Sequence, residues 1–176
     1  MSPTHGRYLL LEQGVGAGVV NFGLNAAIAW GMFRGAESVP LWGQQSIMGD
    51  TIGTCVMLPL LTSLIVTKVA RGQIRTGKMP PLGWSRATHP VLGWLPRGTV
   101  VRGLVLGAVC VVAFAPLAYL YLRAREVDGM GFGRFVLFKA SFAALLGALV
   151  TPAIALWAIG DAPEAVPPPV AAPVAK

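Results

Sequence analysis

The chain has 176 residues, of which 55% are hydrophobic and only 12% are charged. A soluble domain typically carries about 25% charged residues, so these few charges could not cover a water-exposed globule of this size. Intrinsic disorder is excluded as well, because a disordered chain has low hydrophobicity. The remaining class is an integral membrane protein, and the length allows one compact bundle without a separate soluble domain.

The net charge of +7 comes from 14 Lys and Arg against 7 Asp and Glu. In a soluble protein such an excess would indicate a nucleic-acid partner. Beside long apolar stretches it favours anionic lipid headgroups instead, and no nucleic acid is expected. Cys55 and Cys110 both lie inside apolar stretches, where buried thiols behave as small hydrophobic groups.

Four apolar stretches run from about 14 to 33, 47 to 69, 103 to 122 and 135 to 159. Each is close to the roughly 20 residues that a helix needs to cross a hydrocarbon layer. An isolated strand could not satisfy its backbone in lipid, so helices are the expected form. The sequence therefore predicts an all-α, integral membrane four-helix bundle, built as two hairpins in one domain over residues 1–162.

Proline is frequent in the last residues of the chain, 163–176. At that density it blocks a helix and favours an extended chain. We expect a disordered tail there.

From position 68 to position 102 the chain has no acidic residue and carries half of all the positive charge: Lys68, Arg71, Arg75, Lys78, Arg86, Arg97 and Arg102. The positive-inside rule places the loop between the second and third stretches in the cytoplasm, which puts both termini there and the two short loops outside. Richness in alanine, glycine and valine favours a bacterial inner membrane.

Two tryptophans accompany the basic residues of this loop. The expected surface for anionic headgroups consists of Arg71, Arg75, Lys78, Trp84, Arg86, Trp94 and Arg97. A plain solvated linker and a platform that docks a partner protein are the alternatives.

Small residues recur at four-residue spacing, which lets helices approach closely. The predicted packing residues are Gly14, Gly18, Gly49, Gly53, Gly103, Gly107, Ala140 and Ala144. Four short helices enclose little interior, so we expect some of these faces to pack on a second copy or on a larger complex.

Polar residues inside the apolar stretches carry the most information. Asn21 and Asn25 share one helix face. Their amides either hydrogen-bond to a neighbouring helix as structural glue or line a ligand pocket.

Asp50 and Lys139 stand at similar depth in the second and fourth stretches. A charge in hydrocarbon costs about 2.5–3.5 kcal/mol on insertion scales, so such groups are usually paired or functional. We predict an Asp50–Lys139 ion pair, supported by Asn21 or Asn25. The alternatives are that Asp50 caps its helix or belongs to a functional site.

A weak repeat aligns Pro59 with Pro152, 93 positions apart. If real, it would be a parallel repeat, because both hairpins start from the cytoplasm.

No catalytic constellation, cofactor fingerprint or metal-ligand spacing is recognised, so we expect neither an enzyme nor a cofactor. Two functions remain. One is a permease-like protein that binds or moves a small solute or lipid at the polar cluster. The other is a non-catalytic accessory or assembly subunit packed on a larger membrane complex.

Overall fold

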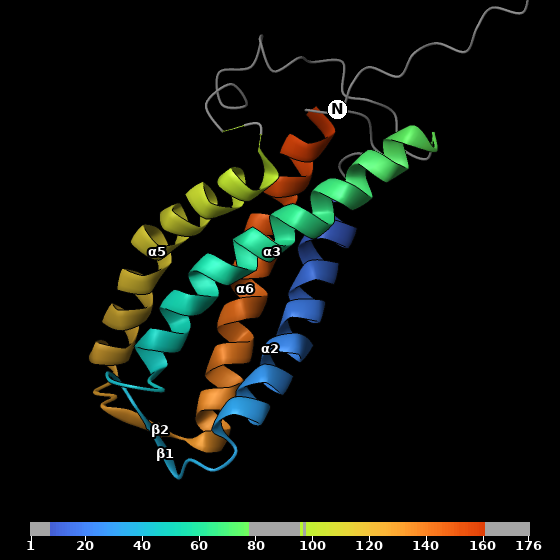
Figure 1. The fold of residues 1–176 in the computed structure, drawn as a ribbon. Helices are drawn as coiled ribbons and strands as arrows, with labels where there is room; N and C mark the ends of the chain where they lie inside the picture. Colours follow the sequence, from blue (N-terminus) through green and yellow to red (C-terminus); the bar gives the residue numbers. More distant parts are fainter. Residues whose placement is uncertain (1–7, 78–95, 97, 161–176) are drawn as a thin grey trace, which may run out of the picture.

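A computed structural model describes residues 8–77, 96 and 98–160 of the chain, and helices make up nearly all of them. A π-helix, η1 (Tyr8–Gly16), continues directly into α2 (Ala17–Phe33). The other long helices are α3 (Ile47–Arg75), α5 (Thr99–Ala124) and α6 (Phe132–Gly160). Two short strands, β1 (Ser38–Pro40) and β2 (Gly129–Gly131), lie in the connections at one end (Figure 1).

Each apolar stretch in the sequence forms a helix. The described residues contain four helices that are long and apolar enough to cross a membrane. α3 continues six residues beyond its predicted end, to Arg75, and stops where Gly77 adopts a φ of +69°. Glycine reaches this left-handed conformation without strain, which makes it a common helix terminator.

The longer α3 corrects part of the predicted loop. Arg71 and Arg75 lie on the last turns of this helix rather than in a loop. The other residues of the predicted headgroup surface, Lys78, Trp84, Arg86, Trp94 and Arg97, and the predicted tail at 163–176 lie outside the described residues.

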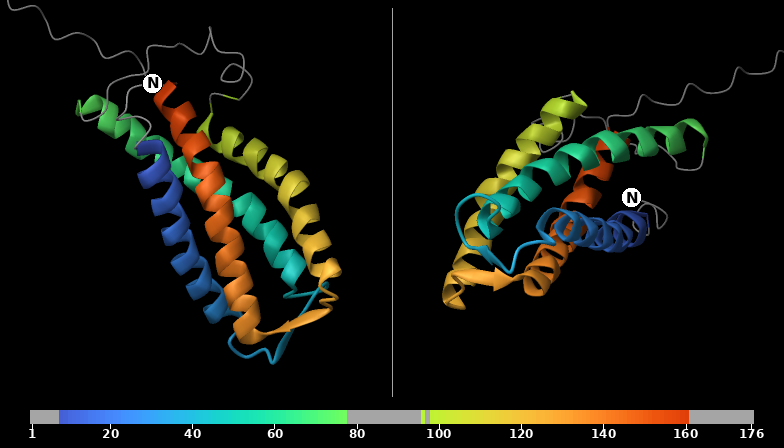
Figure 2. Two further views of the ribbon diagram at one scale, coloured as in Figure 1. Left: turned by 180° about the vertical axis from the view of Figure 1, so that it is seen from behind. Right: turned by 60° about the horizontal axis from the view of Figure 1, so that its bottom comes forward.

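Each long helix packs mainly on a helix of the other hairpin. α2 packs along α6, and α5 packs along α3, whereas α2 and α3 of the first hairpin hardly touch. α3 and α6 form the central pair between them. Seen from behind, α6 lies between α2 and α5 (Figure 2, left).

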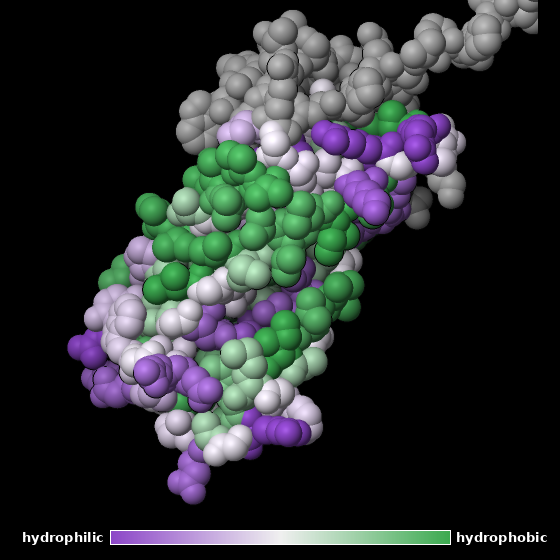
Figure 3. All heavy atoms as spheres, in the orientation of Figure 1, coloured by the Kyte–Doolittle hydropathy of each residue, from purple (hydrophilic) through white to green (hydrophobic). Residues whose placement is uncertain are grey.

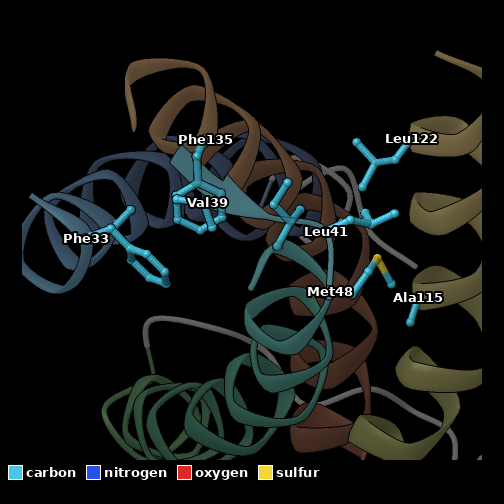
Figure 4. Packing of buried hydrophobic residues seen from close by; sticks show 9 residues of the cluster. Phe33, Val39, Leu41, Met48, Ala115, Leu122 and Phe135 are labelled. Carbon is cyan, nitrogen blue, oxygen red and sulfur yellow. The ribbon is translucent and has the colours of Figure 1, made fainter. Parts of the chain in front are cut away.

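The strands close the end of the molecule opposite the start of η1 (Figure 1). They pair antiparallel, with Val39 opposite Met130 and Pro40 opposite Gly129. An apolar cluster packs beneath them, in which Phe33 and Phe135 place their ring centroids 4.6 Å apart (Figure 4). The strands and this cluster tie the two connections together.

Contacts between the hairpins follow a local two-fold relation with an offset of 89 residues. A Cβ added at Gly18 would lie 3.4 Å from the carbonyl oxygen of Ala144, and one at Gly107 would lie 3.6 Å from that of Cys55. Residues 18 and 107 differ by 89, and so do 55 and 144. Each contact is therefore the two-fold image of the other.

Gly14 and Gly103 behave in the same way. Gly14 faces Pro152 at 3.8 Å, and Gly103 faces Ser63 at 3.3 Å, again with partners 89 apart. The repeat is parallel, as the sequence predicts, but its offset is not 93. Proline positions therefore misalign it, because Pro152 corresponds to Ser63 and not to Pro59.

Candidate functional site

An open groove runs between α2 and α3, with α6 contributing to its lining. Its volume is about 1060 Å³, and its lining extends from Glu12 and Gln13 at one end to Phe33 and Gln45 at the other. The groove exists because α2 leans on α6 instead of on α3, which leaves the two helices apart. Hydrophilic residues lie in the hollow between two hydrophobic borders (Figure 3).

Asp50 and Lys139 form an ion pair in the lining of this groove. The side chains are only 12% and 5% exposed, and Lys139 Nζ donates to Asp50 Oδ1. The two positions are 89 residues apart, so the pair lies on the two-fold relation itself. Burial in a low-dielectric environment makes each charge depend on the other.

Asp50 is not the N-cap of α3. Ser46 holds that position, and its Oγ accepts a hydrogen bond from the Gly49 backbone N–H at 3.1 Å. The side chain of Asp50 lies in the first turn and remains available to Lys139.

Asn21 and Asn25 both line the groove, but they do not hydrogen-bond across to another helix. Asn21 Nδ2 donates to Ala17 O at 2.8 Å, and Asn25 Nδ2 donates to Asn21 O at 3.0 Å. Neither amide forms a hydrogen bond to the Asp50–Lys139 pair among the described contacts. Asn21 packs on α6 instead, where a Cβ added at Gly147 would lie 2.5 Å from its amide nitrogen.

The small residues divide into two groups. Gly14, Gly18, Gly103 and Gly107 contact a neighbouring helix, as predicted, and Ala140 is fully buried in α6. Ala144 also lies at a helix contact, because its carbonyl oxygen is the atom that a Cβ added at Gly18 would approach.

Gly49 and Gly53 differ from the prediction. A Cβ at Gly53 would have no atom within 4 Å, and one at Gly49 would meet only the loop and cap that precede α3. Both glycines border the groove. Here the missing side chains leave space open rather than bring helices together.

The two-fold relation provides an internal comparison for this groove. At the positions corresponding to Gly49, Gly53 and Asn25, the second half carries Phe138, Phe142 and Phe114. The rings of Phe138 and Phe142 stack with centroids 6.3 Å apart.

Phe114 and Phe142 belong to one apolar cluster, which also contains Cys110, the counterpart of Asn21. Bulky apolar side chains therefore occupy the second-half positions where the first half has glycines and amides. The groove of the first half is therefore open and polar, whereas the corresponding region of the second half is filled by apolar side chains.

Thr151 adds a polar atom from α6. It lines the groove, is 3% exposed, and its Oγ1 has no hydrogen-bond partner among the described residues.

A second hollow, of about 550 Å³, lies at the opposite end of α3. It is bordered by Lys68, Arg71 and Arg75, with Thr99 from the start of α5. Arg102 lies close by but is buried, and its Nη2 donates to Thr67 Oγ1 at 3.1 Å. The sequence grouped Arg102 with the loop charges, whereas it is a packed residue of α5.

Sequence reasoning missed the phenylalanines that distinguish the two halves. The signal that identifies them is the 89-residue offset, which becomes visible only through the glycine contacts. No known protein family, characterised protein or solved structure matches this chain in sequence or in fold.

Proposed function

We propose that the chain is an integral membrane protein and that the groove between α2 and α3 binds a small solute or lipid in a permease-like role. The outer surfaces of the helices support membrane insertion, because large apolar side chains such as Val112 and Val19 are 77% and 69% exposed. Apolar exposure on this scale is unfavourable in water and suits a bilayer.

The basic residues support one orientation. Lys68, Arg71 and Arg75 gather at the end of α3 that leads into the long connection. We place this end and both termini in the cytoplasm of a bacterial cell, with the β-strands outside. Anionic headgroups of the inner leaflet are the proposed partners of these cations.

The observation that carries the binding role is the difference between the two halves. Glycine at 49 and 53 keeps the first groove open, whereas phenylalanine occupies the corresponding positions of the second half. The first half therefore lacks apolar packing that the corresponding part of the second half has. The open groove also exposes the edge of a buried ion pair, which favours a ligand site over simple packing.

The groove-filling variant Gly53→Phe tests this role, because it copies Phe142 into the equivalent position. The matched control is Gly23→Phe on α2, where an added Cβ also meets no atom within 4 Å and the position does not line the groove. Each protein is purified in mild detergent, and its bound small molecules are extracted and identified by mass spectrometry.

We expect the native protein and the control to retain a common molecule, and Gly53→Phe to retain it at least about tenfold less, a difference of about 1.4 kcal/mol. Equal retention by all three proteins would refute the role of the groove. A comparison of their elution volumes on gel filtration establishes that the variants are folded.

The accessory-subunit alternative lost part of its support. It depended on small-residue faces available to a partner, but Gly14, Gly18, Gly103 and Gly107 contact other helices of the same chain. Under that alternative, a stoichiometric partner protein would co-purify in the same experiment.

A further inference from the structure

We infer that the ligand of the groove is a single-chain amphiphile whose neutral headgroup both donates and accepts hydrogen bonds at the Asp50–Lys139 pair. The inference rests on the proposed binding role and specifies the class of ligand. Three observations carry it: the length of the groove, the composition of its borders, and the charge at its Asp50–Lys139 end.

The groove is long. Its lining on η1 and α2 runs from Gln13 to Phe33, a helical length of about 30 Å. An extended hydrocarbon chain can lie along a groove of this length.

Two rows of apolar side chains, the rails, border the groove. α2 presents Val20, Leu24 and Ile28, and α3 presents Met57, Leu61 and Ile65. Within each helix these residues are four apart, so they follow one face. All six are exposed, by 40% to 65% of their surface. A chain lying between the rails contacts apolar atoms on both sides, whereas a sugar-like or ionic solute would face them without hydrogen-bond partners.

The end of the groove at Asp50 and Lys139 has no net charge, whereas Glu12 lines the opposite end. Asp50 and Lys139 neutralise each other, and both line the groove. Asp50 Oδ1 is the acceptor found for the ammonium group among the described residues, so further ammonium protons can serve a ligand oxygen. A second carboxylate oxygen of Asp50 can accept from a ligand hydroxyl.

An ionised headgroup would add an uncompensated charge to this poorly hydrated site. The chemistry therefore favours an ester, amide or hydroxyl group over a free acid or an amine.

The test uses the full-length protein in lipid nanodiscs with a C16 monoacylglycerol that carries a photoreactive diazirine at the end of its chain. Labelled peptides are mapped by mass spectrometry in the native protein, in Gly53→Phe and in the control Gly23→Phe. Unlabelled monoacylglycerol, palmitic acid, hexadecylamine and glycerol then compete with the probe.

We expect labelling concentrated on α2 and α3 between the rails, reduced about tenfold in Gly53→Phe and unchanged in Gly23→Phe. The neutral lipid should compete at least about tenfold better than the acid or the amine, and glycerol should not compete. Equal competition by the charged lipids would overturn the headgroup assignment.

Labelling spread evenly over all four helices would overturn the single-chain ligand. That result leaves the proposed function standing if the extraction experiment still yields a molecule whose retention is lowered by Gly53→Phe. Failure of both experiments would remove the proposed function as well.

Discussion

The ion pair between Asp50 and Lys139 is buried and also joins two equivalent positions of the two halves. Both side chains are largely buried, and the 89-residue offset makes their positions equivalent. Removing one partner of a buried pair typically destabilises a protein by about 3–5 kcal/mol, because the other charge stays uncompensated. Because positions 50 and 139 are equivalent, we also expect the protein to tolerate an exchange of the acidic and the basic residue between them.

We therefore expect Asp50→Lys to reduce the folded fraction strongly and the double exchange Asp50→Lys with Lys139→Asp to recover most of it. The recovered protein should remain within about 1 kcal/mol of the native one, since an acidic group at position 50 lies in the first turn of α3 and gains slightly from the helix dipole. Thermal unfolding in detergent measures both variants. Losses that simply add in the double variant would show that the charges do not interact.

The sequence predicted the two partners of the ion pair, but not the contacts of the other polar residues. Asp50 and Lys139 are conspicuous because charges inside apolar stretches are few. Asn21 and Asn25 are equally conspicuous, yet an amide can reach a carbonyl of its own helix as easily as one across an interface. Arg102 was misassigned because it directly follows a basic loop, and hydropathy does not distinguish a packed arginine from a solvated one.

Identical glycine spacing has opposite roles in different helices. Gly103 and Gly107 bring α5 against α3, whereas Gly49 and Gly53 leave a groove open. Spacing predicts that two small residues share a face, but it does not say what that face meets. Helix positions were predictable from the long apolar stretches; the extension of α3 to Arg75 was not, because its last turns are polar.

Gly103→Leu tests the close contact between α5 and α3. An added Cβ at this position would lie 2.8 Å from the Leu60 Cα, so the backbones would have to separate. We expect a loss of about 1–3 kcal/mol or more in unfolding free energy. Gly31→Leu on α2 is the control, because a Cβ there meets no atom within 4 Å. Equal melting temperatures for the two variants would contradict the observed packing.

For the whole molecule, the proposed orientation can be measured by cysteine labelling in intact cells. Glu37→Cys and Asp128→Cys lie in the two connections at the strand end, and Thr76→Cys lies at the far end of α3. The native Cys55 and Cys110 are only 0% and 4% exposed, so they should not react with a bulky maleimide.

We expect a membrane-impermeant maleimide to label positions 37 and 128 from outside and to label position 76 only after the cells are opened. Labelling of position 76 in intact cells would reverse the orientation, and labelling of all three would exclude the proposed threading. The sequence predicts this topology because charge asymmetry sets orientation. It does not predict which helix packs on which, since all four stretches are similarly apolar.

The packing between the two hairpins has a consequence for how the chain is made. α2 is synthesised early, but the helix on which it rests, α6, is the last of the four to leave the ribosome. Until then the first hairpin has no stable interior contact along most of α2. The contacts between α3 and α5 can form first, whereas α2 gains its packing partner only when α6 has been made.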